Sequence, residues 1–312
     1  MSPFRSLTAL TAASFAFALS AHCFAYCLTT TCDPKKEACS YDGTGCNIGG
    51  KPLYWASSVV TWDVQRDGSQ AQHISAQTLG SVVQTAFQKW EAAKCGGGKT
   101  PSIHLQPHGD GLIDCAKPEY NQKQPNANVI TFHDSQWPYT DGGAETNTLA
   151  LTTVFFSPET GEIYDANVEI NSNQQEFVVQ DGVGRQVNLN AVLTHELGHF
   201  LGLSHSPISN ATMFSSYEPG MDTLEADDEA AICASLPPDR AATANPEPRH
   251  GFSGECASAE KGCCSSTIGG KAPVSQSLGL WAFGLGVCAW LGRGRRARRA
   301  ERAARSAQAL RR

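Results

Sequence analysis

The pattern of hydrophobic and polar residues predicts a domain of strands and helices that begins near Pro52. Five short runs are rich in β-branched and aromatic residues, which is typical of strands. They are residues 59–64, 102–106, 128–132, 149–156 and 162–170. The last two runs are joined by S-P-E-T-G, in which Gly161 indicates a hairpin turn.

Two stretches carry apolar residues suited to the buried side of a helix. The first begins after Ser75, a residue type favoured at helix N-caps, and runs to about Ala93. Its apolar residues are Leu79, Val82, Val83, Ala86, Phe87 and Trp90. The glycine-rich run 95–100 ends this helix. The second helix follows Asn188, and its residues available for packing are Val192, Leu193, Leu197, Phe200 and Leu201.

Four polar residues alternate along the run 162–170 and its end, so they share one face of the strand. They are Asp165, Asn167, Glu169 and Asn171. One interpretation is that they bind calcium or form hydrogen bonds beneath the second helix. We favour the other interpretation, a face exposed to solvent, because no recognisable calcium-binding loop accompanies them.

Charge is unevenly distributed along the chain, and this narrows the classes of partner. The tail 293–312 holds nine arginines and one glutamate. Residues 6–292 carry 14 basic and 29 acidic residues, a formal net charge of −15. A body this acidic argues against nucleic acid as a partner. It suits an exported protein, for which Ca²⁺ is a candidate ion.

The N-terminal 25 residues have the pattern of a secretory signal peptide. Arg5 supplies the positive region, residues 7–21 are mostly apolar, and small residues at Ala21 and Ala25 offer cleavage sites. We therefore expect the protein to be secreted or displayed at the cell surface.

The C-terminal part is predicted to comprise three segments. Residues 237–277 are rich in Pro, Ala, Ser and Gly and read as a linker without a packed core. Residues 278–292 form an apolar segment that is short for a full membrane span, and 293–312 form an arginine-rich cytoplasmic tail. The order of these features, with cysteines first, then the apolar run and then the arginines, resembles the MYXO-CTERM sorting signal of myxobacterial surface proteins. The resemblance implies removal of the tail near the cysteines; an ordinary membrane anchor is the alternative.

The chain has twelve cysteines, which in an exported protein indicate disulfides. Cys27, Cys32, Cys39 and Cys46 crowd the segment 26–50, and three connectivities are open to them. Zinc binding by these four is the weaker alternative, because the segment lacks a C-x-x-C pair. We expect Cys95 to pair with Cys115, and the sequence leaves the partner of Cys233 open.

The candidate chemistry lies in residues 188–213, where His195, Glu196 and His199 form H-E-x-x-H. Two histidines four residues apart on a helix share one face and can bind the same metal ion. Zinc suits such nitrogen ligands, and a catalytic zinc keeps one position open for water. Glu196 could take the proton of that water as general base. Gly202 can end the helix and return His205 as the third ligand.

The extended motif H-E-x-x-H-x-x-G-x-x-H followed by Met213 resembles the metzincin metallopeptidases. Ser206 after the third histidine, and L-E-A-D-D-E-A-A-I from Leu224, are similar to the matrixins among them. The resemblance covers about residues 53–236. It implies an α+β catalytic domain, here 51–236, with a twisted mixed sheet, an active-site helix and a C-terminal helix.

The resemblance also implies roles for residues around the motif. Met213 is expected to pack beneath the zinc ligands, and Tyr217 is the candidate wall of the S1′ pocket. Ser215 replaces a usual proline, so the depth of that pocket is open. Asp227 and Asp228 match aspartates that anchor the C-terminal helix and can meet a new N-terminus, although Asp228 fits a surface helix charge equally well.

Two family features have no match in this sequence. The histidine of the L-A-H-A strand is absent, because residues 149–152 read L-A-L-T, so we predict no structural zinc. The propeptide motif P-R-C-G-x-P-D is also absent between Ala25 and Pro52. One of the four cysteines there could in principle block the zinc, but we expect disulfides.

Together these features predict a zinc endopeptidase that acts on extracellular proteins or peptides, as a monomer. Membrane contact is expected only through the C-terminal segment before sorting. Two alternatives remain open at this stage. One is an inactive surface-binding module that keeps a structural zinc, and the other is a zinc amidase that acts on cell-wall peptides.

Overall fold

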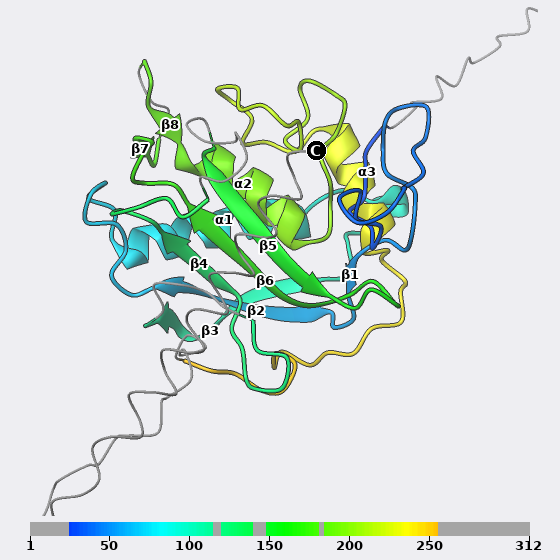
Figure 1. Cartoon of the computed structure of the whole chain (residues 1–312), viewed down its shortest axis with the longest axis horizontal. Helices are drawn as coiled ribbons and strands as arrows, with labels where there is room; N and C mark the ends of the chain where they lie inside the picture. Colours follow the sequence, from blue (N-terminus) through cyan, green and yellow to red (C-terminus); the bar gives the residue numbers. More distant parts are fainter. Residues whose placement is uncertain (1–24, 115–119, 140–147, 181–183, 255–312) are drawn as a thin grey trace, which may run out of the picture. The chain divides into compact units, whose positions relative to one another are not determined.

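The computed structural model describes residues 25–114, 120–139, 148–180 and 184–254, which all lie in one compact unit (Figure 1). The predicted signal peptide up to residue 24, the apolar segment 278–292 and the arginine-rich tail lie outside the described residues. In the part of the chain that is described, no helix is both long and apolar enough to cross a membrane.

A mixed, mostly parallel sheet forms the frame of the domain (Figure 1). Its strands are β1 (Tyr54–Trp55), β2 (Val59–Gln65), β3 (His104–Ile113), β4 (Val129–Phe132), β5 (Ala150–Phe156) and β6 (Glu162–Ile170). They follow the order β1-β6-β4-β2-β3, and β5 pairs with β6. The β5–β6 hairpin is the antiparallel part of the sheet, and all other pairs are parallel.

Within the described residues, three α-helices accompany the sheet: α1 (Ala76–Glu91), α2 (Leu189–Phe200) and α3 (Ala226–Ser235). Ser75 caps α1, since its hydroxyl accepts a hydrogen bond from the Thr78 N–H. The shorter elements are the 3₁₀ helix η1 (Gly96–Gly98) and the strands β7 (Phe177–Val178) and β8 (Val187–Asn188), which pair with each other.

Helices α1 and α2 pack together and against the apolar face of the sheet. Trp90 of α1 is fully buried, and its indole N–H donates to the carbonyl of Thr194 on α2 at 2.9 Å. The rings of Phe87 and Phe200 meet edge to face, with centroids 5.2 Å apart. This packing fixes α2 in place, and α2 carries the H-E-x-x-H motif.

The predicted α+β class and mixed sheet are confirmed. The run 162–170 coincides with β6, and the helix after Ser75 was predicted to within two residues. The run 102–106 continues to Ile113 as the longer strand β3. The two-residue strands β1, β7 and β8 were missed, because so short a segment has no measurable period and depends on a distant partner.

The prediction of a solvent-exposed face on β6 was wrong. Asp165, Asn167 and Glu169 are each less than 5% exposed, and Asn171 is fully buried. Glu169 accepts a hydrogen bond from the hydroxyl of Tyr139 and lies 2.6 Å from Nε2 of His133. Loops before and after β4 cover this face, which an alternating strand pattern alone does not reveal.

Three disulfides connect the described cysteines: Cys27–Cys46, Cys32–Cys39 and Cys95–Cys233. The first two select one of the three connectivities that were open. The expected pair of Cys95 with Cys115 is wrong, because Cys95 binds Cys233 on α3, 138 residues away. Sequence proximity favoured Cys115, whereas the fold brings the end of α1 next to α3.

Residues 237–254, here called the strap, correct the expectation of a linker without packing. Arg240 donates hydrogen bonds to the carbonyls of Trp55, Ser57 and Ser102. Thr243 pairs with Ser57, and Phe252 pairs with Asn126. The strap therefore extends the folded domain beyond α3; the rest of the predicted linker, 255–277, lies outside the described residues.

Candidate metal site

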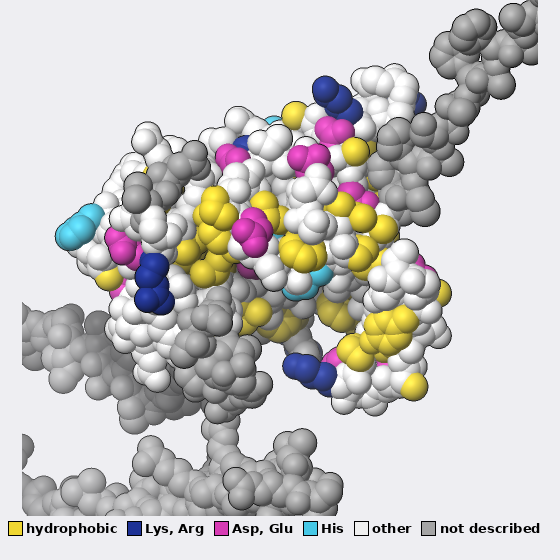
Figure 2. Space-filling model, turned by 90° about the horizontal axis from the view of Figure 1, so that it is seen from above, with side chains coloured by type: hydrophobic (Ala, Val, Ile, Leu, Met, Phe, Trp, Pro, Cys, Tyr) yellow, Lys and Arg dark blue, Asp and Glu magenta, His cyan; other side chains and the backbone are white. Residues whose placement is uncertain are grey.

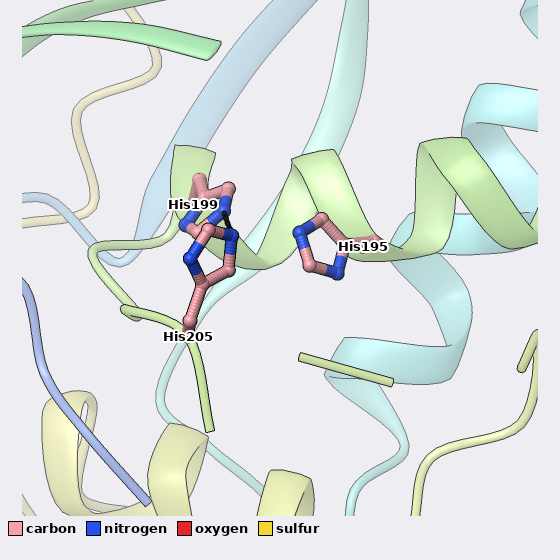
Figure 3. Close-up of side chains that lie close together, drawn as sticks. All are labelled: His195, His199 and His205. Carbon is pink, nitrogen blue, oxygen red and sulfur yellow. Dashed lines mark hydrogen bonds between the residues drawn. The ribbon is translucent and has the colours of Figure 1, made fainter. Parts of the chain in front are cut away.

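Helix α2 places two of the three histidines of the motif on one side. The side chain of Asn188 caps the helix by accepting from the Asn190 N–H at 2.9 Å. Leu189, Leu193 and Leu197 are fully buried. With its apolar side facing the core, α2 presents His195 and His199 one turn apart, and both rings point to the same space (Figure 3).

A tight turn after α2 brings the third histidine to the same space. Gly202 has φ 91°, and a Cβ atom there would approach the carbonyl oxygen of Leu53 to 2.7 Å. Both the backbone angle and the close packing require glycine. The chain then reverses, and His205 reaches up from the following loop toward His199 (Figure 3).

The three imidazoles are close enough to share one ion. One nitrogen of each ring lies within 4.8 Å of the others, and Nε2 of His199 is 3.2 Å from Nε2 of His205. Two nitrogens bound at zinc's usual distance in tetrahedral geometry lie about 3.3 Å apart. The three nitrogen donors therefore suit zinc, and the spacing of His199 and His205 is close to that of two zinc ligands. No other group of three such ligand residues occurs among the residues described.

Backbone carbonyls orient two of these rings. Nδ1 of His195 lies 2.7 Å from the oxygen of Thr212, and Nδ1 of His199 lies 2.9 Å from the oxygen of Leu203. A carbonyl can only accept, so Nδ1 carries the proton in each ring. Nε2 then keeps its lone pair free for a metal, as is usual for metal-binding histidines.

The surroundings of His199 and His205 favour the neutral forms of these two residues. Burial, followed by the nearby imidazoles of His195 and His205, lowers the pKa of His199 well below its usual value. Burial, followed by His195, lowers the pKa of His205 to about 4. Neutral imidazole is the form that binds zinc, so these residues need not lose protons at neutral pH.

Glu196 lies between the two histidines of α2 in sequence and is 8% exposed. Its Oε2 accepts a hydrogen bond of 2.6 Å from the hydroxyl of Thr152 on β5, which also lies 3.0 Å from the Glu196 carbonyl oxygen. Burial raises the pKa of this carboxyl, while His195 and Thr152 oppose the shift. Sequence analysis missed Thr152, whose only signal was its place at the end of L-A-L-T.

The comparisons with known proteins agree with this geometry. Residues 122–235 match the model of the matrixin peptidase family. Matrilysin of Homo sapiens is 29% identical over 170 residues, which cover 53% of this chain and 51% of matrilysin. In residues 122–235 the chain is therefore similar to the matrixin peptidases, a group of the metzincins.

Two further relatives match shorter shares of their own length. Karilysin of Tannerella forsythia is 30% identical over 100 residues, covering 32% of this chain and 19% of karilysin. Matrix metalloproteinase-25 of Homo sapiens is 29% identical over 167 residues, covering 53% of this chain and 25% of that protein. The chain thus spans about half or less of the length of the curated relatives that it matches.

The methionine turn of the matrixin-like domain lies under α2. Met213 is 1% exposed, and a Cβ atom on Gly198 would approach its sulfur to 2.2 Å. The carboxylate of Asp228 accepts hydrogen bonds from the N–H groups of Thr212 and Met213 at 2.8 and 3.0 Å. Because Thr212 also holds His195, Asp228 supports that histidine through one intermediate residue.

Asp228 is fully buried, so its interpretation as a surface charge was wrong. Its neighbour Asp227 accepts two hydrogen bonds. One comes from the hydroxyl of Ser206 at 2.6 Å, and the other from the backbone N–H of Ala25 at 2.8 Å. In Figure 1 the N-terminal segment accordingly lies beside α3. The start of α3 thus connects the N-terminal segment with the residue that follows His205.

Tyr217 lies near the beginning of α2 in the matrixin-like domain. Its hydroxyl accepts a hydrogen bond of 3.1 Å from the Asn188 N–H, and its ring packs against the core. The face shown in Figure 2 carries a band of hydrophobic side chains, mixed with acidic ones, and few lysines or arginines.

Proposed function

We propose that the chain is an exported zinc endopeptidase that hydrolyses peptide bonds of extracellular proteins. The observation that carries this proposal is the convergence of His195, His199 and His205 beside the buried carboxylate of Glu196. The matrixin family supports a zinc metallopeptidase at the level of the family. Since the match spans about half or less of the length of the curated relatives, the activity itself is our proposal.

The three histidines would hold the zinc through Nε2, with two rings fixed by the carbonyls of Thr212 and Leu203. A zinc ion held by these residues would supply a Lewis acid that lowers the pKa of a bound water and polarises the scissile carbonyl. Glu196 accepts the proton of the attacking water and delivers it to the leaving amine. Thr152 orients this carboxylate by its hydrogen bond to Oε2.

Substrate would lie in extended form along β5, which pairs with β6 alone in the described sheet. The other edge of β5 can accept a peptide by strand addition. Because Thr152 of this strand contacts Glu196, a peptide on β5 runs close to the metal site. Met213 supports the ligands from below, and Tyr217 forms the wall of the S1′ pocket.

Export is part of the same proposal. The three disulfides among the described residues suit an oxidising compartment, which agrees with a signal peptide at 1–25. The arginine-rich tail and the apolar segment before it would direct the protein to the cell surface, with removal near the cysteines of 255–277. Calcium is kept as a candidate ion only, since the buried polar face of β6 forms its own hydrogen bonds.

Glu196 favours an enzyme over an inactive binding module. A structural zinc needs its three ligands and no base, whereas this chain buries a carboxylate next to them and supplies Thr152 to hold it. Burying a carboxylate is costly, and a purely structural site would gain nothing from it.

Cleavage of an unstructured protein tests the proposal. The full-length chain, with its zinc content measured, is incubated with casein in the presence and absence of a chelator, beside Glu196→Ala. We expect chelator-sensitive cleavage that Glu196→Ala reduces at least about 100-fold while zinc is retained. Thr152→Ser keeps the hydroxyl and serves as a control that should retain activity.

Two results would change the proposal. Equal cleavage by the wild type and Glu196→Ala would remove Glu196 from the chemistry. Zinc without cleavage of casein, but with cleavage of cell-wall peptides in a substrate panel, would assign the chain to the amidases instead.

A further inference from the structure

The N-terminal segment 26–50 lies against the turn that carries the third histidine. Residues 27–29 run antiparallel to 202–204, with Leu28 opposite Leu203. The N–H of Thr29 donates to the carbonyl of Gly202, and the N–H of Ser204 donates to the carbonyl of Cys27, both at 2.9 Å. The family model matched residues 122–235 and so does not include this segment.

One side chain of the segment reaches the hydrogen bond that orients a histidine. The hydroxyl of Thr29 donates to the carbonyl oxygen of Leu203 at 2.8 Å. The same oxygen accepts from Nδ1 of His199 at 2.9 Å. Leu203 thus uses both lone pairs of its oxygen, one for the imidazole and one for Thr29.

Farther along the same short strand, hydrogen bonds tie it to the chain that leads into β1, with Thr30 opposite Pro52. The N–H of Leu53 donates to the carbonyl of Thr29 at 2.8 Å, and the N–H of Thr31 donates to the carbonyl of Lys51 at 2.9 Å. Gly202 itself packs against the Leu53 backbone so closely that a Cβ would not fit. Residues 27–31 are therefore hydrogen-bonded both to the ligand turn and to the chain leading into β1.

The two disulfides of the segment differ in their relation to this strand. The Cys27–Cys46 bridge includes Cys27, whose carbonyl accepts the hydrogen bond from the Ser204 N–H. Both cysteines are less than 9% exposed. Cys32–Cys39 joins two cysteines that are seven positions apart in the sequence, beyond the paired strand. Only the first bridge joins the residues that hold the ligand turn.

We infer that segment 26–50 is a working part of the metal site, in which Thr29 is a positioning residue for His199 through the carbonyl of Leu203. This inference rests on the proposed zinc site. In this inference, the Cys27–Cys46 disulfide holds residues 27–31 against the ligand turn. Segment 26–50 is then a permanent support of the site and not a removable inhibitory segment.

The affinity of the full-length chain for zinc tests this inference without reference to cleavage. Zinc is removed, and its dissociation constant is measured by competition with a chromophoric chelator. Thr29→Val removes the hydroxyl at nearly constant volume and should weaken zinc binding about 10-fold or more, as for other groups that orient metal ligands. Thr29→Ser should restore wild-type affinity.

Thr44→Val is the matched control on the same segment. The Thr44 hydroxyl lies 2.7 Å from Oδ1 of Asp42 and 3.2 Å from Sγ of Cys46. The variant leaves the Cys27–Cys46 bridge and the hydroxyl of Thr29 in place, so it should bind zinc as the wild type does. Likewise, Cys27→Ser with Cys46→Ser should weaken zinc binding, whereas Cys32→Ser with Cys39→Ser should leave the affinity nearly unchanged. Near-ultraviolet circular dichroism of each metal-free variant confirms that it is folded.

The results separate the two proposals. If the wild type binds zinc tightly and Thr29→Val binds it equally well, Thr29 has no positioning role and the inference is wrong while the zinc site stands. If Thr29→Val and Thr44→Val lose affinity alike, the effect is general and the inference is equally overturned. If the wild type binds no zinc, the proposed function fails and takes the inference with it.

Discussion

The two faces of β6 are both buried, but one is apolar and the other is polar. On one face, Ala166, Val168 and Ile170 are fully buried against the helices, and they support α2 and its histidines. On the other face, Asp165, Asn167 and Glu169 are nearly as deeply buried, but in a network of hydrogen bonds. The first face is stabilised by loss of apolar surface from water, and the second only by satisfying its polar groups.

The difference shows where an alternating pattern misleads. Alternation of apolar and polar residues fixes which residues share a face, but not whether loops later cover the polar one. Here His133 and Tyr139 reach Glu169, and Asn167 receives the N–H of Val129 at 2.8 Å. The polar face is thus a second, hydrogen-bonded interior on the side of β6 opposite the apolar core.

The largest effect is expected on the apolar face. Ile170→Ala removes three buried carbon atoms beneath the helices and should lower the free energy of unfolding by about 2–5 kcal/mol. Urea unfolding followed by tryptophan fluorescence measures this change. A loss below about 1 kcal/mol would show that this face is not the main source of stability.

A pH-dependent effect is expected on the polar face. Burial raises the pKa of Asp165 to about 8, against the opposing hydrogen bond from Asn167. The folded state therefore keeps this carboxyl protonated at pH values where the unfolded chain has lost the proton. Its contribution to stability is lost progressively as pH rises from about 4 to about 8.

Asp165→Asn removes this titration and keeps an oxygen that can accept from Asn167. The variant should be more stable than the wild type near pH 8 by an amount on the order of a few kcal/mol, and no more stable near pH 4. Melting temperatures from pH 4 to pH 8 give both curves. Parallel curves would mean that Asp165 titrates normally.

The smallest effect is expected from Glu169→Gln. In Glu169 each carboxylate oxygen has its own partner, His133 or Tyr139. The single amide oxygen of glutamine can keep only one of these two contacts as an acceptor. We expect a cost of about 1–3 kcal/mol in urea unfolding, without loss of bound zinc. Loss of zinc in a folded variant would show that the polar face acts directly on the metal site.

The apolar pattern predicted much of the frame, because burial of long runs leaves a period in the sequence. The run 162–170 and the helix after Ser75 are such cases. The histidines of the candidate site were found because their spacing follows from the geometry of one helix and one glycine turn. Their metal-binding roles remain predictions.

The parts that sequence analysis missed depend on pairing between distant segments. Cys95 binds Cys233, Thr29 contacts Leu203, and Thr152 contacts Glu196, over separations of 138, 174 and 44 residues. No local pattern reports such contacts. The strap was misjudged for a related reason, since its composition resembles a linker while Arg240 and Phe252 bind it to the sheet.

X-ray absorption at the zinc edge of the purified full-length chain is the most direct test of the central claim, that three histidines bind one zinc. The account predicts one zinc per chain with three imidazole nitrogens and one oxygen, at about 2.0–2.1 Å. A sulfur ligand at about 2.3 Å would show that a cysteine holds the metal, and absence of zinc would contradict the metal site itself.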